Sequence, residues 1–374
     1  MFDRIYDIFD IMEGMELFYE LVQIALGTKE GILSRTPSER EWYRLFEIAQ
    51  KQAIVGITFA ALDKLATYGQ KPPIALLYEW FGQSEQIKKQ NQLLNRRCGE
   101  ITKIFADADF RTCILKGQGN TLMYPEPLLR TSGDIDIWVE GDRDDIRRFV
   151  FSKFPNATDG DMHIEFPIFG DVPVEVHYKP RYSSVPKYEN RLQTWFGEQA
   201  NEQFSHTVNL DGSEICVPTA KFNAIQQMSH MMGHFISEGI GMRHLMDYYY
   251  VLKELRKRGK TDDYAVLFKY LGLDRFASGI MWIEHKVLRI EKELLIVPAS
   301  ERIGKIILKS VMEGGNFGHH RKENIIRNKS ILWRGLIDAY GMIRIMPVQP
   351  AEVMYRLMQK LGNVKSMKLA MRGD

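Results

Sequence analysis

The spacing of hydrophobic residues changes twice along the chain, and this change constrains the fold more than any other feature. Over residues 13–108, apolar side chains such as Trp42 and Leu45 recur every three or four positions, which is the pattern of amphipathic helices. Short alternating segments rich in β-branched residues follow, and the helical spacing returns after Pro218. We therefore predict an α+β protein in which helical regions flank a small mixed sheet.

These changes divide the chain into three predicted regions: a helical N-terminal region over 1–109, an α/β core over 110–217 and a helical C-terminal region over 218–374. After Pro72-Pro73, a long helix is expected from Ile74 to about Ala108. The predicted core strands are 112–115, 134–139, 163–166 and 172–178, with helical segments at 117–123 and 143–151. The predicted C-terminal helices lie near 219–236, 241–258, 262–271, 275–289, 298–313 and 323–361.

Charge and cysteine content exclude several classes of protein. The chain has 50 Lys and Arg against 48 Asp and Glu, a net charge of +2, which is too small a charge to attract long nucleic acid or a membrane surface in general. Three separate cysteines without a C-x-x-C pair encode neither a disulfide framework nor a thiolate zinc site. There is no secretion-signal pattern at the N-terminus and no long apolar run. We therefore expect a cytoplasmic protein without a membrane segment.

The tetrapeptide Asp134-Ile135-Asp136-Ile137 carries the strongest chemical signal. In a strand, residues two apart share a face, so both carboxylates are expected on one side and the isoleucines on the other, against a helix. Glu175 and His177 repeat this arrangement on a later strand. Neighbouring carboxylates repel each other unless one is protonated or a cation lies between them, and Mg²⁺ prefers such oxygen ligands. Three converging carboxylates would form a two-metal site; the alternative is a solvated strand face.

A glycine turn precedes the two aspartates by about 15 residues. The segment Ile114 to Asn120 passes from a strand through Lys116-Gly117-Gln118-Gly119 into a helix. Backbone N–H groups at such a turn can hold phosphate, so these four residues are candidates for contact with a nucleotide. Arg130 lies between the turn and the aspartates, and its guanidinium suits either a phosphate or the third carboxylate.

Together, the turn, Asp134, Asp136 and Glu175 resemble the nucleotidyltransferase superfamily typified by DNA polymerase beta. The sequence is more closely similar to a bacterial family of uncharacterised nucleotidyltransferases, through Leu115-Lys116-Gly117, Tyr124-Pro125, Arg130, Asp134-Ile-Asp136 and Glu175-x-His177. The resemblance implies that the three carboxylates bind metal and are catalytic, and that Lys116, the turn, Arg130 and His177 lie around the nucleotide. Two positions differ from the superfamily pattern: Gln118 replaces a second Gly or a Ser, and Glu175 replaces an Asp.

The predicted helix near 219–236 has an unusual second face, formed by Asn223, Gln227, His230 and His234. Uncharged amides and histidines favour a wet cleft or an interdomain contact over an ordinary solvated surface. We expect this stripe to face the acidic site, with His234 binding phosphate more strongly when it is protonated. The alternatives are structural histidines and a zinc site, although the glutamate of an HExxH motif is missing.

Arg243 and Asp247, on the next predicted helix, are four residues apart. They are expected to pair with each other, to form a capping or inter-helix salt bridge, or to contact substrate in the cleft.

The resulting hypothesis is a nucleotidyltransferase that uses two Mg²⁺ ions to move a nucleoside monophosphate from a nucleoside triphosphate, with ATP expected, to a small-molecule or protein acceptor through a hydroxyl or a phosphate. Two alternatives remain open at this stage. One is a catalytically degenerate nucleotide-binding or regulatory protein of the same fold, which Gln118 mildly favours. The other is a metal-dependent hydrolase built on His230 and His234.

Overall fold

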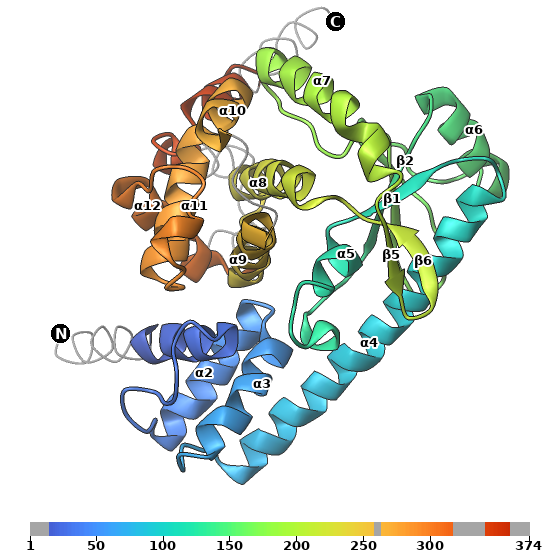
Figure 1. Cartoon of the computed structure of the whole chain (residues 1–374). Helices are drawn as coiled ribbons and strands as arrows, with labels where there is room; N and C mark the ends of the chain where they lie inside the picture. The colour runs from blue at the N-terminus through green and yellow to red at the C-terminus, as the bar shows by residue number, and fades with distance from the viewer. Residues whose placement is uncertain (1–14, 258–262, 317–340, 360–374) are drawn as a thin grey trace, which may run out of the picture.

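The computed structural model describes residues 15–257, 263–316 and 341–359. Residues 15–26 are helical, and α2 (Glu39–Lys51), α3 (Val55–Ala66) and the 33-residue α4 (Ile74–Ala106) follow. The long helix after the two prolines is therefore confirmed. In Figure 1, α4 runs diagonally from the N-terminal helices to the sheet, so one helix links two parts of the molecule.

The core sheet has four strands, β1 (Thr112–Leu115), β2 (Ile135–Val139), β3 (His163–Glu165) and β4 (Val174–His177), in the order β1-β2-β4-β3. Strands β2 and β4 are parallel, while the other two pairs are antiparallel. The predicted small mixed sheet is confirmed, with strand bounds within two residues of those expected.

The two faces of the sheet have different partners. Ile135, Ile137 and Val176 belong to a buried cluster with Ile101 of α4 and Val150 of α6 (Arg143–Lys153). The opposite face is covered by α8 (Ala220–Ser237), where Phe222 stacks on Trp138 at 5.6 Å between ring centroids. Because side chains alternate along a strand, Asp136 lies on the α8 side with Trp138.

Five further elements complete the core region. The short α5 (Gly117–Thr121) and the 3₁₀ turn η1 (Pro127–Leu129) precede β2. The predicted elements did not include helix α7 (Pro186–Gln203) or the hairpin of β5 (Thr207–Leu210) and β6 (Ser213–Cys216). Asp211-Gly212 forms the hairpin turn with both φ angles positive, and Asp-Gly is a known hairpin signal.

The C-terminal region contains α8, α9 (Met242–Lys257), α10 (Tyr264–Leu271), α11 (Asp274–Lys286), η2 (Lys292–Leu294) and α12 (Glu301–Gly314). The expected helix over 323–361 lies partly outside the described residues. Its described part is helical at 341–345 and 350–359, with a turn between these segments. The expectation of one continuous helix is wrong there because Pro347 and Pro350 interrupt the backbone hydrogen bonding.

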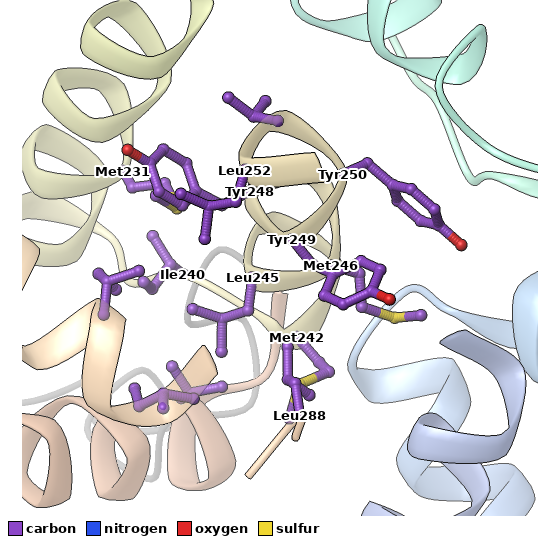
Figure 2. Close-up of a cluster of buried hydrophobic side chains, with 14 of the residues drawn as sticks. Met231, Ile240, Met242, Leu245, Met246, Tyr248, Tyr249, Tyr250, Leu252 and Leu288 are labelled. Carbon is purple, nitrogen blue, oxygen red and sulfur yellow. The ribbon is translucent and has the colours of Figure 1, made fainter. Parts of the chain in front are cut away.

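Helix α9 lies at the centre of the helical packing. Figure 2 shows its buried side chains, including Leu245, Tyr248 and Leu252, pointing in several directions around the helix axis. A helix with apolar side chains on all sides is buried. The largest buried cluster accordingly joins the N-terminal helices to the C-terminal ones. Within the described residues, no helix has the length and apolar character needed to cross a bilayer.

Candidate active site

Three carboxylates converge at one edge of the polar sheet face. Asp134 directly precedes β2, Asp136 lies on β2, and Glu175 lies opposite Asp136 on the parallel strand β4. One oxygen of each carboxylate lies within 4.8 Å of the other two. The prediction that these residues lie on adjacent strands within reach of a common metal ion is confirmed. We call them the acidic triad.

Asp136 is the buried member of the acidic triad and is paired with two nitrogens. Its Oδ1 lies 2.9 Å from Lys116 Nζ and 2.8 Å from His177 Nε2. Burial by itself raises the pKa of Asp136, but the Lys116 ammonium and the His177 hydrogen bond together hold that pKa below its ordinary value. Asp136 is therefore ionised at neutral pH.

Asp134 has the opposite electrostatic environment. The residue keeps an exposed surface, but its carboxyl lies among the other charged groups of the site. The charge of Asp136 first, and then partial desolvation, raise the pKa of this carboxyl, and Lys116 partly offsets them. This is the repulsion expected of clustered carboxylates that lack enough positive charge. Three hard oxygen ligands with unrelieved repulsion suit Mg²⁺, so the residues present fit the metal that the sequence predicted.

His177 is in contact with two members of the acidic triad, because its Nε2 also lies 3.3 Å from Glu175. His163 of β3, which the sequence analysis missed, lies 3.6 Å from the same Glu175 carboxylate. His163, Glu175 and His177 form a second group with the spacing of metal ligands. The two groups share Glu175, so His163 and His177 border the metal-binding candidates directly. The β3–β4 pairing in register, His163 opposite His177, depends on strand order and left no local signal in the sequence.

The glycine turn brings Lys116 to Asp136. Lys116 has a φ of 50° and Gly117 a φ of 27°, a conformation that favours glycine at the second position. A Cβ on Gly117 would lie 3.5 Å from the Asp134 carbonyl oxygen. The turn therefore lies against the start of β2 and places the Lys116 ammonium beside the acidic triad.

The expected role of Gln118 in binding the nucleotide is corrected by its position. Its side chain is 1% exposed and donates hydrogen bonds to Asn95 Oδ1 and the Asn91 carbonyl of α4. The Asn120 amide is also engaged, since it donates to the Lys116 carbonyl. Gly119 instead permits close packing, because a Cβ there would meet Val217 at 3.3 Å. The differing residue Gln118 thus anchors the turn to α4.

The sequence analysis allowed a contact between Arg130 and Glu175, but Arg130 instead pairs with Asp247. Its guanidinium donates two hydrogen bonds to Asp247 of α9, at 2.7 and 2.6 Å, and both side chains are buried. Tyr124 donates a third hydrogen bond to the same carboxylate. Arg243 Nη1 donates to the Thr131 carbonyl, and the charge of Arg243 also acts on Asp247 and helps to lower its pKa. Arg130, Asp247 and Arg243 therefore hold the loop before β2 against α9.

The polar stripe of α8, expected to face the acidic site, lies against the glycine turn beside that site. Asn223 and Gln227 both donate to Asn120 Oδ1, and His230 Nδ1 lies 3.4 Å from Lys116 Nζ. The first two residues therefore have structural hydrogen bonds. Lys116 contacts both His230 of the stripe and Asp136 of the acidic triad, and it therefore connects the two.

His230 and His234 form a histidine cluster with His244 of α9, with ring centroids 4.3 to 6.4 Å apart. Within the described part of the chain, neither group of side chains with metal-ligand spacing includes them. Burial first, followed by the charges of neighbouring Lys116 and Arg181, lowers the pKa of His230. The pKa of His234 is also lowered, chiefly by burial. Both shifts disfavour protonation of these two histidines in the free protein, and the contact of His234 with phosphate stays a prediction.

The sequence analysis also missed Arg181, which follows β4 and is 7% exposed. It acts electrostatically on both His230 and His234. Gly233, between these histidines, leaves room for its guanidinium. A glycine inside a helix signals close approach of another group, but the sequence does not identify that group.

Comparisons with known proteins identify a matching family. No curated protein matches the sequence significantly. Among solved structures, an antigenic nucleotidyltransferase-like protein from Paracoccidioides brasiliensis aligns with 56% of this chain and 95% of its own, with 12% identity and a TM-score of 0.33. The profile of a family described as "Uncharacterised nucleotidyltransferase" matches residues 38–289, which include the acidic triad, the turn and helix α8. This match extends over more than half of the chain, and the protein therefore belongs to this family of uncharacterised nucleotidyltransferases.

Proposed function

We propose that this protein is a magnesium-dependent nucleotidyltransferase that moves a nucleoside monophosphate from a nucleoside triphosphate, with ATP expected, to an acceptor hydroxyl or phosphate. The observation that carries the proposal is the convergence of Asp134, Asp136 and Glu175 at one sheet edge. Family membership supports a nucleotide as one substrate. The small net charge favours a small-molecule or protein acceptor over long nucleic acid.

In this reaction an acceptor oxygen bonds to the α-phosphorus, the bond to the bridging oxygen of the β-phosphate breaks, and pyrophosphate leaves. Asp134, Asp136 and Glu175 would hold two Mg²⁺ ions, which when bound neutralise phosphate charge and activate the acceptor oxygen. Glu175, half-buried and lying beside His177 and His163, orients the acceptor and receives its proton. Lys116, which lies next to Asp136, compensates negative charge on the phosphates.

Lys116 and His177 hold Asp136 in position before any nucleotide binds. Lys116 lies at the end of β1 and His177 at the end of β4, so the two strands that flank β2 each contribute one contact. Such a preorganised carboxylate loses little freedom when it binds a cation. The donor geometry thus supports a catalytic arrangement over a merely solvated strand face.

The first test needs no acceptor. Binding of a non-hydrolysable α,β-methylene analogue of each nucleoside triphosphate is measured by calorimetry with and without Mg²⁺. We expect Mg²⁺-dependent binding that is lost in Asp134→Asn, while Arg191→Gln on α7, a substitution remote from the acidic triad, matches the wild type. Equal binding with and without Mg²⁺ would contradict the proposed metal site.

The second test separates catalysis from regulation. The protein is incubated with Mg²⁺, a cell extract as a source of acceptors, and ATP labelled at either the α- or the γ-phosphate. Nucleotidyl transfer puts only the α-label into product and releases pyrophosphate. A regulatory protein of the same fold would bind the analogue yet transfer neither label, and transfer of the γ-label would indicate a kinase.

A further inference from the structure

Arg181 is a buried cation next to the proposed active site. It lies in the segment between β4 and α7, its backbone carbonyl accepts a hydrogen bond from Gln193, and its residue exposure is 7%. Its guanidinium lies directly against Gly233 of α8, because a Cβ at position 233 would overlap Nη2 and come within 2.7 Å of Cζ. The glycine thus makes room for the charged group.

No described residue accepts a hydrogen bond from this guanidinium or forms an ion pair with it, and its Nε is buried without a partner. Its described aromatic contact is with Tyr182, whose ring centroid is 5.5 Å from Cζ. The carboxylates that act on it electrostatically, Asp136 and Glu238, have other partners. Asp136 pairs with Lys116 and His177, and Glu238 lies 3.2 Å from His234. The positive charge of Arg181 is therefore not compensated by these carboxylates.

An uncompensated guanidinium is costly to bury, and it remains charged at all physiological pH values. Further positive charge surrounds it: Arg356 acts on Arg181 electrostatically, and Lys116 lies beside the neighbouring His230. Such a group is stabilised by an anion that accepts its parallel N–H bonds, and phosphate oxygens fit that geometry. The arrangement suits a bound phosphoryl group.

We propose that Arg181, seated on Gly233 beside His230 and His234, binds a phosphoryl group of a substrate next to the acidic triad. This inference rests on the proposed function, which places the nucleotide and the acceptor at that triad. The phosphoryl group belongs either to the tail of the nucleoside triphosphate or to a phosphorylated acceptor. Because both sources present the same terminal phosphate oxygens, the experiment includes titrations that distinguish one source from the other.

The test uses three variants of the full chain. Arg181→Gln removes the charge, and Gly233→Ala introduces a Cβ where the guanidinium lies. Alanine also favours the helix by about 1 kcal/mol relative to glycine, so this second variant keeps α8 folded and displaces Arg181. Arg191→Gln on α7 is the matched control, since it removes an arginine that bonds the Tyr270 carbonyl, away from α8.

Calorimetric titration with inorganic phosphate, without Mg²⁺ or nucleotide, is the first measurement. We expect Arg181→Gln and Gly233→Ala to weaken phosphate binding at least tenfold and Arg191→Gln to leave it unchanged. Titration with the α,β-methylene analogue and with nucleoside monophosphate follows. If the site holds the triphosphate tail, Arg181→Gln weakens binding of the analogue but not of the monophosphate. Inorganic phosphate then competes with the analogue for binding. If it holds an acceptor phosphate, analogue affinity is unchanged and phosphate binds alongside the analogue.

The proposal is overturned if Arg181→Gln and Gly233→Ala both bind phosphate and the analogue within twofold of the wild type. It is also overturned if the wild type binds no phosphate and neither variant changes the analogue affinity. Failure of the proposed function gives a different result, because the wild type then lacks Mg²⁺-dependent binding of the analogue. The phosphate titration, performed without Mg²⁺, is interpreted separately from that outcome.

Discussion

Asp136 and Glu175 lie directly opposite each other on the parallel strands β2 and β4. This register places both side chains on the sheet face covered by α8, and the alternation of β2 adds Asp134 two residues earlier. Asp136 is already paired with Lys116 and His177, whereas Asp134 is exposed to the charge of Asp136. The aspartates of the D-x-D motif therefore differ in how they affect the metal-free protein.

Asn substitutions should reveal this difference. Asp136→Asn is expected to lower the free energy of unfolding of the metal-free protein by about 2–4 kcal/mol, because it leaves the half-buried Lys116 ammonium and the buried His177 without their carboxylate. Asp134→Asn is expected to leave that free energy unchanged or to raise it, because it removes a charge that Asp136 repels. Urea unfolding in a chelator measures both.

Both substitutions should abolish stabilisation by Mg²⁺, which in the wild type is about 2.7 kcal/mol at a concentration 100 times the Kd. Asp211→Asn, in the β5–β6 turn, is a control carboxylate outside the acidic triad. If Mg²⁺ stabilises Asp134→Asn as much as it stabilises the wild type, this aspartate does not hold the metal.

The Arg130–Asp247 pair should stabilise the fold strongly. Both side chains are buried and joined by two hydrogen bonds, so Asp247→Asn and Arg130→Met are each expected to lower the free energy of unfolding by about 3–5 kcal/mol. The double variant Arg130→Met/Asp247→Asn should lose less than the sum, because neither charge remains buried alone. Chemical denaturation of the four proteins gives the coupling energy. Single losses below about 1 kcal/mol would show that the pair is weak.

Gln118 provides a test of anchoring against phosphate contact. Gln118→Ala should reduce the free energy of unfolding by about 1–3 kcal/mol, because it leaves buried polar groups of α4 without a donor. The affinity for the α,β-methylene analogue should stay within about threefold of the wild type, since its side chain points to α4 and not to the acidic triad. Lys116→Met, beside Asp136, should weaken that affinity more than tenfold. A large loss of affinity in a fully stable Gln118→Ala protein would restore the side chain to the nucleotide site.

The sequence was sufficient for the parts of the site that depend on local periodicity. Strand alternation sets the shared face of Asp134 and Asp136, and the apolar positions between them identify the face that packs on α4 and α6. The spacing of α8 likewise separated its polar stripe from its apolar side. These features follow from the repeat of one element and need no knowledge of its neighbours.

Contacts between distant segments could not be read in the same way. Arg130 reaches Asp247 across 117 residues, and the sequence offered a nearer candidate in the i, i+4 position. The Arg181 guanidinium is positioned by the path of the segment after β4 and by the space above Gly233. Side-chain partners of this kind depend on tertiary packing, which hydrophobic periodicity does not predict.

The histidine cluster gives the last prediction, which concerns acid stability. His230 faces Lys116 from the turn, Arg181 from the segment after β4, His234 on its own helix and His244 from α9. Burial and these four neighbours all favour the neutral imidazole, so the pKa of His230 in the folded protein lies well below its unfolded value of 6.5. The neutral ring also accepts at Nδ1 from the Lys116 ammonium.

The sign of the effect follows from proton uptake. As the pH falls below about 6.5, the unfolded chain binds a proton that the folded protein still excludes, so the free energy of unfolding decreases. We expect urea unfolding between about pH 5 and about pH 8 to show falling stability on the acid side. His230→Gln, which keeps an acceptor near Lys116 but cannot ionise, should reduce that slope. If His230→Gln shows the same acid-side slope as the wild type, the folded protein does not exclude a proton from His230 and the prediction is wrong.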